Sequence, residues 1–215
     1  MKRTCFALAL SLLAACASSK ITAFRDPAYA TKRFASVVVF AQGMALDAAL
    51  KMETDICAKL APTPCVTGKS VLPPTREYQP NEAAEYLSRS GAEAVLVLAL
   101  VSDQSDSRYF GTIVNSTGTA STTSSGNVNF FGNSALWSGT SYTSTSAQTT
   151  AIPLYAFSRI ALGQLGLFER RTGEIAWRGE IKVTGQGALN ISDGAFINSA
   201  TSKVAEELKT SGLVN

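Results

Sequence analysis

The chain has 215 residues, of which 46% are hydrophobic, with 19 Lys and Arg, 16 Asp and Glu, and no histidine. A charge balance this close to neutral excludes the basic surface that binds nucleic acid or an acidic membrane surface. The missing histidine removes the commonest general base and metal ligand.

The first 15 residues are typical of a secretory signal peptide. Lys2 and Arg3 come before a short uncharged, apolar run that ends in small residues. This run is too short to cross a bilayer as a helix, which takes about 20 residues. Leu13 to Cys16 resembles a bacterial lipobox, and this resemblance implies cleavage before Cys16 and a lipid on its sulfur. The alternative is an ordinary signal peptide with an incidental cysteine.

Cleavage before Cys16 changes the charge and suggests a location. It removes Lys2 and Arg3, which lowers the basic count from 19 to 17 against 16 acidic residues, so the mature net charge is +1. Acyl chains on Cys16 would then attach the protein to a membrane. Ala17, instead of an aspartate, follows the cysteine, and the resemblance to lipoprotein sorting signals implies the inner face of the outer membrane.

We expect residues 16–34 to form a lipidated tether and residues 35–215 to form one α/β domain. The first half of this domain has the pattern strand, helix, strand, helix, strand, which predicts parallel pairing through right-handed crossovers. Continuous apolar runs predict central strands, and apolar residues at three- and four-residue spacing predict amphipathic helices. The expected elements in this half are strand 36–41, helix 44–60, strand 65–72, helix 81–90 and strand 93–101.

Cys57 and Cys65 are the cysteines that the mature domain would keep, in a compartment that oxidises thiols. They stand at the end of a predicted helix and the start of the next strand, so we expect a disulfide between them. Two buried free thiols are the alternative. A zinc site is less favoured, because two cysteines without a histidine cannot complete the usual tetrahedral set.

An uncharged segment separates the two halves of the domain. Residues 109–158 contain no charged side chain, and 19 of the 39 residues from Thr112 to Thr150 are Ser or Thr. So long a connection is rare in a compact domain and is usually functional or disordered. We interpret residues 105–151 as an insertion and favour a flexible surface loop.

The second half predicts an antiparallel hairpin and a final helix. Residues 155–168 are rich in strand formers, Arg170 to Gly173 are typical of a turn, and residues 175–183 alternate between apolar and polar. Ser192 is a suitable N-cap for a helix that ends at Gly212. The whole pattern predicts an α/β sandwich of two or three layers with a mixed sheet.

The hairpin and the last helix also resemble a known family. The residues that carry the resemblance are the run from Leu165 to Gly179, with its Thr-Gly turn and Ile-Ala-Trp-Arg-Gly strand, and Leu208 to Leu213. They resemble small outer-membrane lipoproteins of the TolB amino-terminal and CsgG-like group, which includes LpoB-type activators of penicillin-binding proteins. Glu169 stands where that group more often has Asp. The resemblance covers about residues 35–104 and 152–214 and implies a fold more strongly than an activity.

The sequence offers no catalytic constellation and no phosphate-binding motif. We therefore expect a non-enzymatic, lipid-anchored periplasmic protein, without cofactor or metal, that binds another envelope protein. Arg170 and Arg171 are candidates for contact with an acidic partner, although a solvated turn explains them as well. The alternative is an oligomeric secretion or pore component whose uncharged insertion forms membrane or assembly hairpins.

Overall fold

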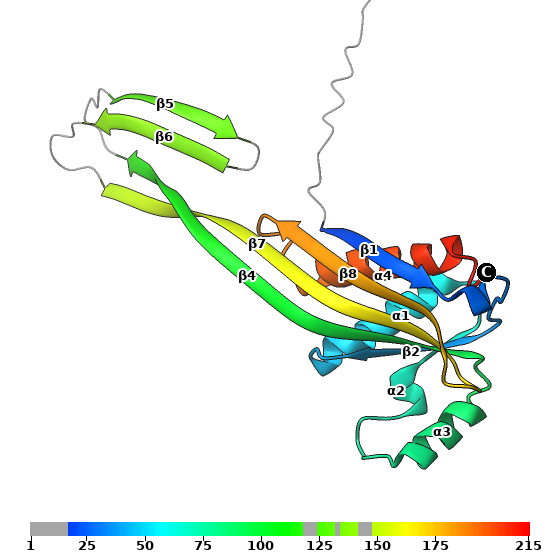
Figure 1. Ribbon diagram of the computed structural model, residues 1–215. Helices are drawn as coiled ribbons and strands as arrows, with labels where there is room; N and C mark the ends of the chain where they lie inside the picture. Colours follow the sequence, from blue (N-terminus) through cyan, green and yellow to red (C-terminus); the bar gives the residue numbers. More distant parts are fainter. Residues whose placement is uncertain (1–16, 118–123, 132–133, 142–147) are drawn as a thin grey trace, which may run out of the picture.

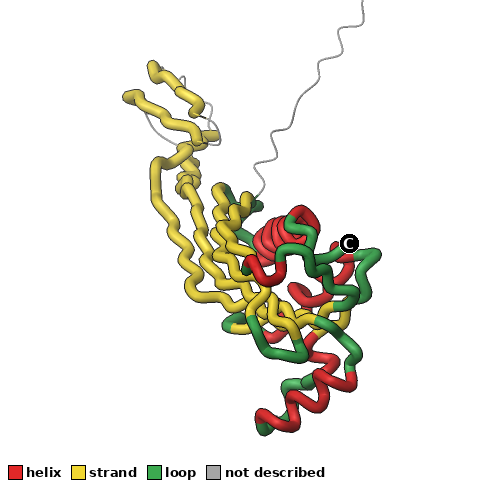
Figure 2. The backbone as a smooth tube through the Cα atoms, turned by 45° about the vertical axis from the view of Figure 1, so that its right-hand side comes forward, coloured by secondary structure: helices red, strands yellow, loops and turns green. Residues whose placement is uncertain are grey.

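The computed structural model describes residues 17–117, 124–131, 134–141 and 148–215. Its centre is a six-stranded mixed sheet with the strand order β1-β8-β7-β4-β2-β3. Helices α1 and α4 contact each other and cover one face of this sheet (Figures 1 and 2). The α/β sandwich expected from the sequence is confirmed, with two layers over most of the sheet.

The elements follow the chain in an order close to the predicted one. The main strands are β1 Ser18–Arg25, β2 Val37–Gln42, β3 Cys65–Thr67, β4 Ala94–Thr117, β7 Gln148–Glu169 and β8 Ile175–Gln186. A separate two-stranded sheet consists of β5 Ser124–Phe131 and β6 Ser134–Ser141. The helices are α1 Leu46–Leu60, α2 Gly68–Val71, α3 Pro80–Arg89 and α4 Asp193–Thr210, with a 3₁₀ turn at Pro27–Tyr29.

The sheet is parallel on one side and antiparallel on the other. Strand β2 pairs in parallel with both β3 and β4. Strands β4, β7, β8 and β1 then pair antiparallel in that order. The crossovers expected in the first half of the chain and the hairpin expected in the second are therefore both present.

The hydrophobic core lies between this sheet and helices α1 and α4. Alternate residues of each strand point toward the helices, as the two-residue period of a strand requires. Trp177 on β8 is 1% exposed and is among the largest core side chains. The core residues of α1 and α4 are Ala49, Met52, Ile56, Leu60, Phe196, Ile197, Ala200, Val204, Ala205 and Leu208.

The opposite face of the sheet is covered only in part. Helix α2 contacts β2 and β3, and the ring of Phe40 packs against Gly68, where an added Cβ would lie 2.2 Å from the ring. Over β4 and β7, Val101, Ile160 and Leu162 are exposed. Helix α3 contains no buried residue.

The predicted tether is wrong at residues 18–25. Residues 18–25 form strand β1, which pairs with β8 from Ser18–Thr184 to Arg25–Trp177. The Arg25 guanidinium donates to the backbone oxygens of Tyr29, Lys32 and Ser211, and so joins this segment to the end of α4. Alternation is weak in this strand, because an edge strand with one solvated face can carry polar residues at most positions.

The predicted loop at 105–151 is also wrong where the structure describes it. Residues 105–117 and 148–151 continue β4 and β7, and the two strands stay in register as far as Thr117–Gln148. Ser and Thr occupy a strand as readily as a loop, since Thr is β-branched and backbone hydrogen bonds need no particular side chain. The parts of the insertion at 118–123, 132–133 and 142–147 lie outside the described residues.

The short segment after Cys65 differs in a smaller way. The predicted strand 65–72 covers only Cys65–Thr67 and then turns into α2. The positive φ angles of Gly91 and Gly212 support the predicted helix ends, and the Ser192 hydroxyl accepts from the backbone N–H of Ala195 at the start of α4.

Candidate functional site

A two-stranded ribbon projects from the body of the domain (Figure 1). Strand β8 ends at Gln186, which pairs with Ser158, and beyond that pair the described residues of β4 and β7 pair with each other. We call residues 106–117 of β4 and 148–158 of β7 the ribbon. Its length is about 35 Å at the usual rise of a strand. Bulges opposite Gly163 and Leu154 interrupt the β4–β7 register, the first in the body of the sheet and the second within the ribbon.

The ribbon carries exposed apolar and aromatic side chains and few charges. Tyr109 and Tyr155 face each other across the two strands, with ring centroids 5.8 Å apart, and both are about half exposed. Ile113 and Ile152 form a second exposed pair closer to the tip. A solvated strand pair would not need these side chains, so they mark the ribbon as a candidate contact surface.

An ion-pair cluster fixes the base of the ribbon to helix α4. Arg159 on β7 donates from Nε to Asp103 on β4 over 2.8 Å, and from Nη1 to Asp193 on α4 over 2.6 Å. It also donates to the Ile191 carbonyl, and its guanidinium lies 4.7 Å from the centroid of the Phe196 ring. The Arg159 hydrogen bond lowers the pKa of Asp103, and the same bond raises the pKa of Arg159.

The first described residues leave the body at the same end as the ribbon. Ser18 pairs with Thr184, which in turn pairs with Ile160, the β7 residue two positions from the base of the ribbon. The Ser19 hydroxyl lies 2.7 Å from that of Ser199 on α4, and Ala17 is only 9% exposed. Cys16, the predicted lipid site, lies outside the described residues but directly precedes Ala17.

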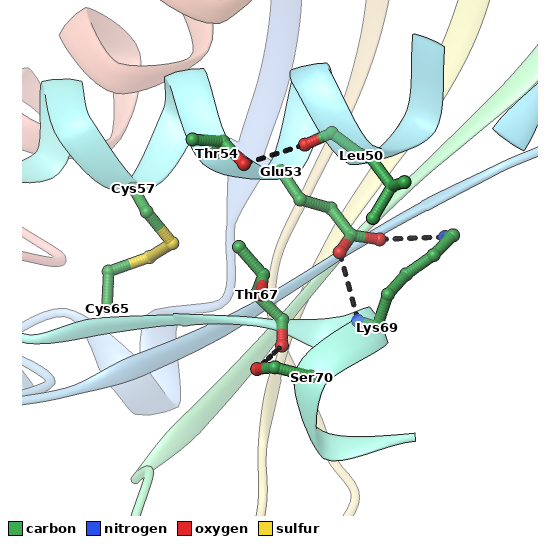
Figure 3. The surroundings of a disulfide bond; sticks show 8 residues. All are labelled: Leu50, Glu53, Thr54, Cys57, Cys65, Thr67, Lys69 and Ser70. Carbon is green, nitrogen blue, oxygen red and sulfur yellow. Dashed lines mark hydrogen bonds and ion pairs between the residues drawn. A yellow bond between two sulfur atoms is a disulfide. The ribbon is translucent and has the colours of Figure 1, made fainter. Parts of the chain in front are cut away.

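Cys57 and Cys65 form a disulfide, with an S–S distance of 2.02 Å (Figure 3). It joins α1 to β3, which is the pairing that the sequence analysis expects. The fully buried carboxylate of Glu53 lies nearby and binds Lys69, with 2.9 Å between Oε1 and Nζ. Glu53 also accepts the backbone N–H groups of Ala41 and Lys69. The two links hold the β3–α2 segment against α1.

Arg170 and Arg171 do not belong to the ribbon end of the molecule. They occupy the β7–β8 turn, next to the Glu169–Ala94 pair at the far end of the sheet. Arg170 donates to the Ala92 carbonyl. Arg171 is 79% exposed and lies 3.8 Å from Glu169. The solvated-turn interpretation therefore accounts for Arg171, and a backbone contact accounts for Arg170.

A buried polar cluster beside this turn was not foreseen from the sequence. Glu169 accepts from Lys32 Nζ over 2.6 Å and from the Tyr29 hydroxyl over 2.9 Å. The Tyr29 hydroxyl also donates to Glu174, and the pKa of Tyr29 is raised to about 12. Thr172 lowers this pKa, but burial and the two carboxylates outweigh that effect. Because its members lie about 140 residues apart, no local pattern could reveal it.

The part of the chain that the structure describes has neither a metal-binding cluster nor a membrane-spanning helix. Its Cys, Asp and Glu side chains form no group of three or more that could hold a metal ion. No helix among these residues is both long and apolar enough to span a bilayer.

Comparison with known proteins gives a weak structural likeness and no family. No family model matches the chain, and no curated protein matches it. Among solved structures, the PelC dodecamer from Paraburkholderia phytofirmans and a point variant of it are each 14% identical to this chain, with a TM-score of 0.44. The matches cover 92% and 91% of this chain and 99% of each PelC chain. The resemblance to TolB-like and CsgG-like lipoproteins stays a prediction.

Proposed function

We propose that this chain is a lipid-anchored periplasmic protein at the outer membrane that binds another envelope protein through its ribbon. It acts by binding and not by catalysis. The observation that carries the proposal is the ribbon itself, a partly apolar projection with few charges at the end of the sheet where the chain leaves toward Cys16.

The short distance to Cys16 gives the proposal its geometry. Two peptide steps separate Cys16 from Ser18, which limits the gap to about 7 Å. A lipid on Cys16 would therefore hold the base of the ribbon close to the membrane surface. The partner would be met at that surface and not deep in the periplasm.

Site-specific crosslinking tests the ribbon as the contact. A photo-crosslinking residue at Tyr155 should give one discrete adduct in native envelopes. The same residue at Phe24, which is 67% exposed on the open face of the sheet, is the matched control and should give none. Equal adducts at both positions, or none at Tyr155, would contradict a ribbon-bound partner.

The anchor needs its own test. Intact mass measurement of protein from the membrane fraction should show the chain beginning at Cys16 with added acyl mass. The Cys16→Ser variant should leave the membrane fraction and appear as soluble periplasmic protein. Wild-type chain that is soluble and carries no acyl mass would refute the anchor.

The length of the ribbon favours one alternative, an oligomeric secretion or pore component. From Tyr109–Tyr155 to Thr117–Gln148 the strands pair without a charged residue over nine positions of β4. Spanning strands need about 9–11 residues and a lipid-facing apolar side. The high content of Ser and Thr argues against such a side. Planar-bilayer recordings with detergent-extracted protein decide between the two, since only a pore gives stepwise conductance that a ribbon-trimmed variant lacks.

A further inference from the structure

A cavity of about 290 Å³ lies between the two core helices and the sheet, beside the base of the ribbon. Its walls come from the first halves of α1 and α4 and from β4, β7 and β8. The small residues Ala48, Ala161, Gly163 and Ala200 line it, and they leave space where larger side chains would fill the layer. The remaining wall residues include Met44, Met52, Leu98, Leu100, Ile181 and Phe196.

The chemistry of these walls is aliphatic. Apart from the cluster at Arg159, the lining side chains are apolar, and two are methionines, whose flexible thioethers adapt to different ligand shapes. An engineered apolar cavity of roughly 150 Å³ stays dry and binds benzene. A cavity of about twice that size holds roughly a dozen carbon atoms.

The polar groups at the cavity have no capacity left for an anion. Arg159 lies there with Asp103 and Asp193, and its guanidinium is already bound to both carboxylates and to the Ile191 carbonyl. Two carboxylates around one guanidinium leave a net negative charge. A carboxylate or phosphate head would be repelled, so a ligand here does not have an anionic head.

The cavity lies close to Ala17, the residue that precedes strand β1. Gly185 follows the β1 partner Thr184, and an added Cβ on Gly185 would lie 2.7 Å from the ring of Phe196. Phe196 forms part of the cavity wall. Ala17 comes directly before Ser18, the β1 residue that pairs with Thr184, and is itself buried. An aliphatic chain attached at Cys16 would begin beside this wall, and its thioether link carries no charge.

We propose that the cavity binds one aliphatic chain whose head is not anionic. The two sources are the lipid of Cys16 and a free amphiphile from the membrane. The first source rests on the proposed lipid anchor, whereas binding of a free chain does not.

The binding test uses the Cys16→Ser protein, which has no lipid of its own. Dodecyl maltoside below its micelle concentration should raise the Tm, and the anion dodecanoate should bind at least tenfold more weakly. Ala48→Leu should weaken dodecyl maltoside binding at least tenfold without lowering the Tm of the free protein. Ala58→Leu, at an exposed position of the same helix, is the control and should bind like the parent. No Tm increase, or equal binding by Ala48→Leu, would overturn the proposal.

Thiol labelling separates the two sources. Ala48→Cys should resist maleimide in the lipidated protein and react in the Cys16→Ser background if the protein's own lipid occupies the cavity. Ala58→Cys should react in both backgrounds. Equal labelling at Ala48→Cys, together with dodecyl maltoside binding, supports the free amphiphile as the source. Failure of lipidation would leave the binding test intact, so the two proposals fail separately.

Discussion

Glu169 is a carboxylate whose nearest neighbours favour its charged form. The hydrogen bond from Lys32 is the largest cause that lowers its pKa, followed by the bond from Tyr29, and both outweigh burial. A group with a lowered folded-state pKa stabilises the protein above its unfolded pKa, near 4.5. That contribution is lost as the pH falls through the folded pKa.

We therefore predict that Glu169→Gln flattens the acid side of the stability profile. Urea unfolding between pH 7 and pH 3 should show a steeper loss for the parent than for the variant. Glu180→Gln, at an exposed position on β8, is the control and should keep the parent profile. Parallel profiles for the parent and Glu169→Gln would contradict this role of Glu169.

Arg159 is the residue that ties the ribbon base to α4. Its removal leaves Asp103 and Asp193 without their shared cation, and charge-assisted hydrogen bonds are each worth about 1.5–3 kcal/mol. We predict that Arg159→Ala lowers the free energy of unfolding by about 2 kcal/mol. Arg171→Ala should change it by less than about 0.5 kcal/mol, because Arg171 is exposed and has only one distant partner. Equal losses in urea titrations would mean that the ion-pair cluster at Arg159 does not contribute to the free energy of unfolding.

At the scale of elements, removal of β1 tests whether this segment is a strand of the fold or a tether outside it. The three Arg25 hydrogen bonds to carbonyl groups together contribute on the order of 5 kcal/mol, which is comparable to the total stability of a small domain. Deletion of residues 17–26 should therefore abolish cooperative unfolding or remove most of the stability. A chain that begins at Ala17 is the control and should unfold like the mature protein in thermal scans. A tether would make the two chains equally stable.

The disulfide fixes a second element, the short strand β3 at the opposite edge of the sheet. It closes a loop between residues eight apart, for which the chain-entropy model gives about 2–3 kcal/mol. We predict this loss for the Cys57→Ala, Cys65→Ala double variant in urea titrations. Reductant should lower the parent to the same stability and leave the double variant unchanged. A parent insensitive to reductant would show that the bridge does not stabilise the fold.

At the scale of the whole molecule, the ribbon adds reach without supporting the core. Where the structure describes its side chains, at residues 106–113 and 151–158, none of the ribbon belongs to the hydrophobic core. Replacement of residues 110–154 by Asn-Gly joins the facing pair Tyr109 and Tyr155 through a favoured two-residue turn. We predict an unchanged Tm for this trimmed protein. A loss of several degrees would mean that the ribbon stabilises the body.

Light scattering then shows whether the ribbon also assembles copies. Under the interaction proposal, both the intact and the trimmed proteins run as monomers. A defined oligomer that is lost on trimming would favour the pore alternative.

The sequence predicted the parts of this fold that have a local pattern. The stripe of α4 and the alternation around Trp177 show their elements within a few residues, because the core side of a helix or strand repeats at a fixed spacing. The continuous apolar run at Val37–Ala41 shows its strand because a central strand is covered on both faces. Ser18–Arg25 and the ribbon have no such repeat. Their structure depends on pairing with strands far along the chain.

The candidate site was less accessible to sequence reasoning than the fold. Cys57 and Cys65 are close in sequence and could be paired from spacing and compartment alone. Arg159, Asp103 and Asp193 come from three elements, and nothing in the sequence placed them together. Arg170 and Arg171 were candidates because they are adjacent charges, but the Ala92 carbonyl before β4 accounts for Arg170 and solvent accounts for Arg171.

The pairing of β1 with β8 has a consequence for how the chain folds. The hydroxyls of Ser18 and Thr184 are hydrogen-bonded across 166 positions of sequence. β1 therefore has no partner in the sheet until nearly the whole chain is available to fold. Contacts this distant slow folding, since the entropy of closing the intervening chain is lost before the contact forms. β1 can therefore join the sheet only once β8 has formed, and its pairing edge is without this partner until then.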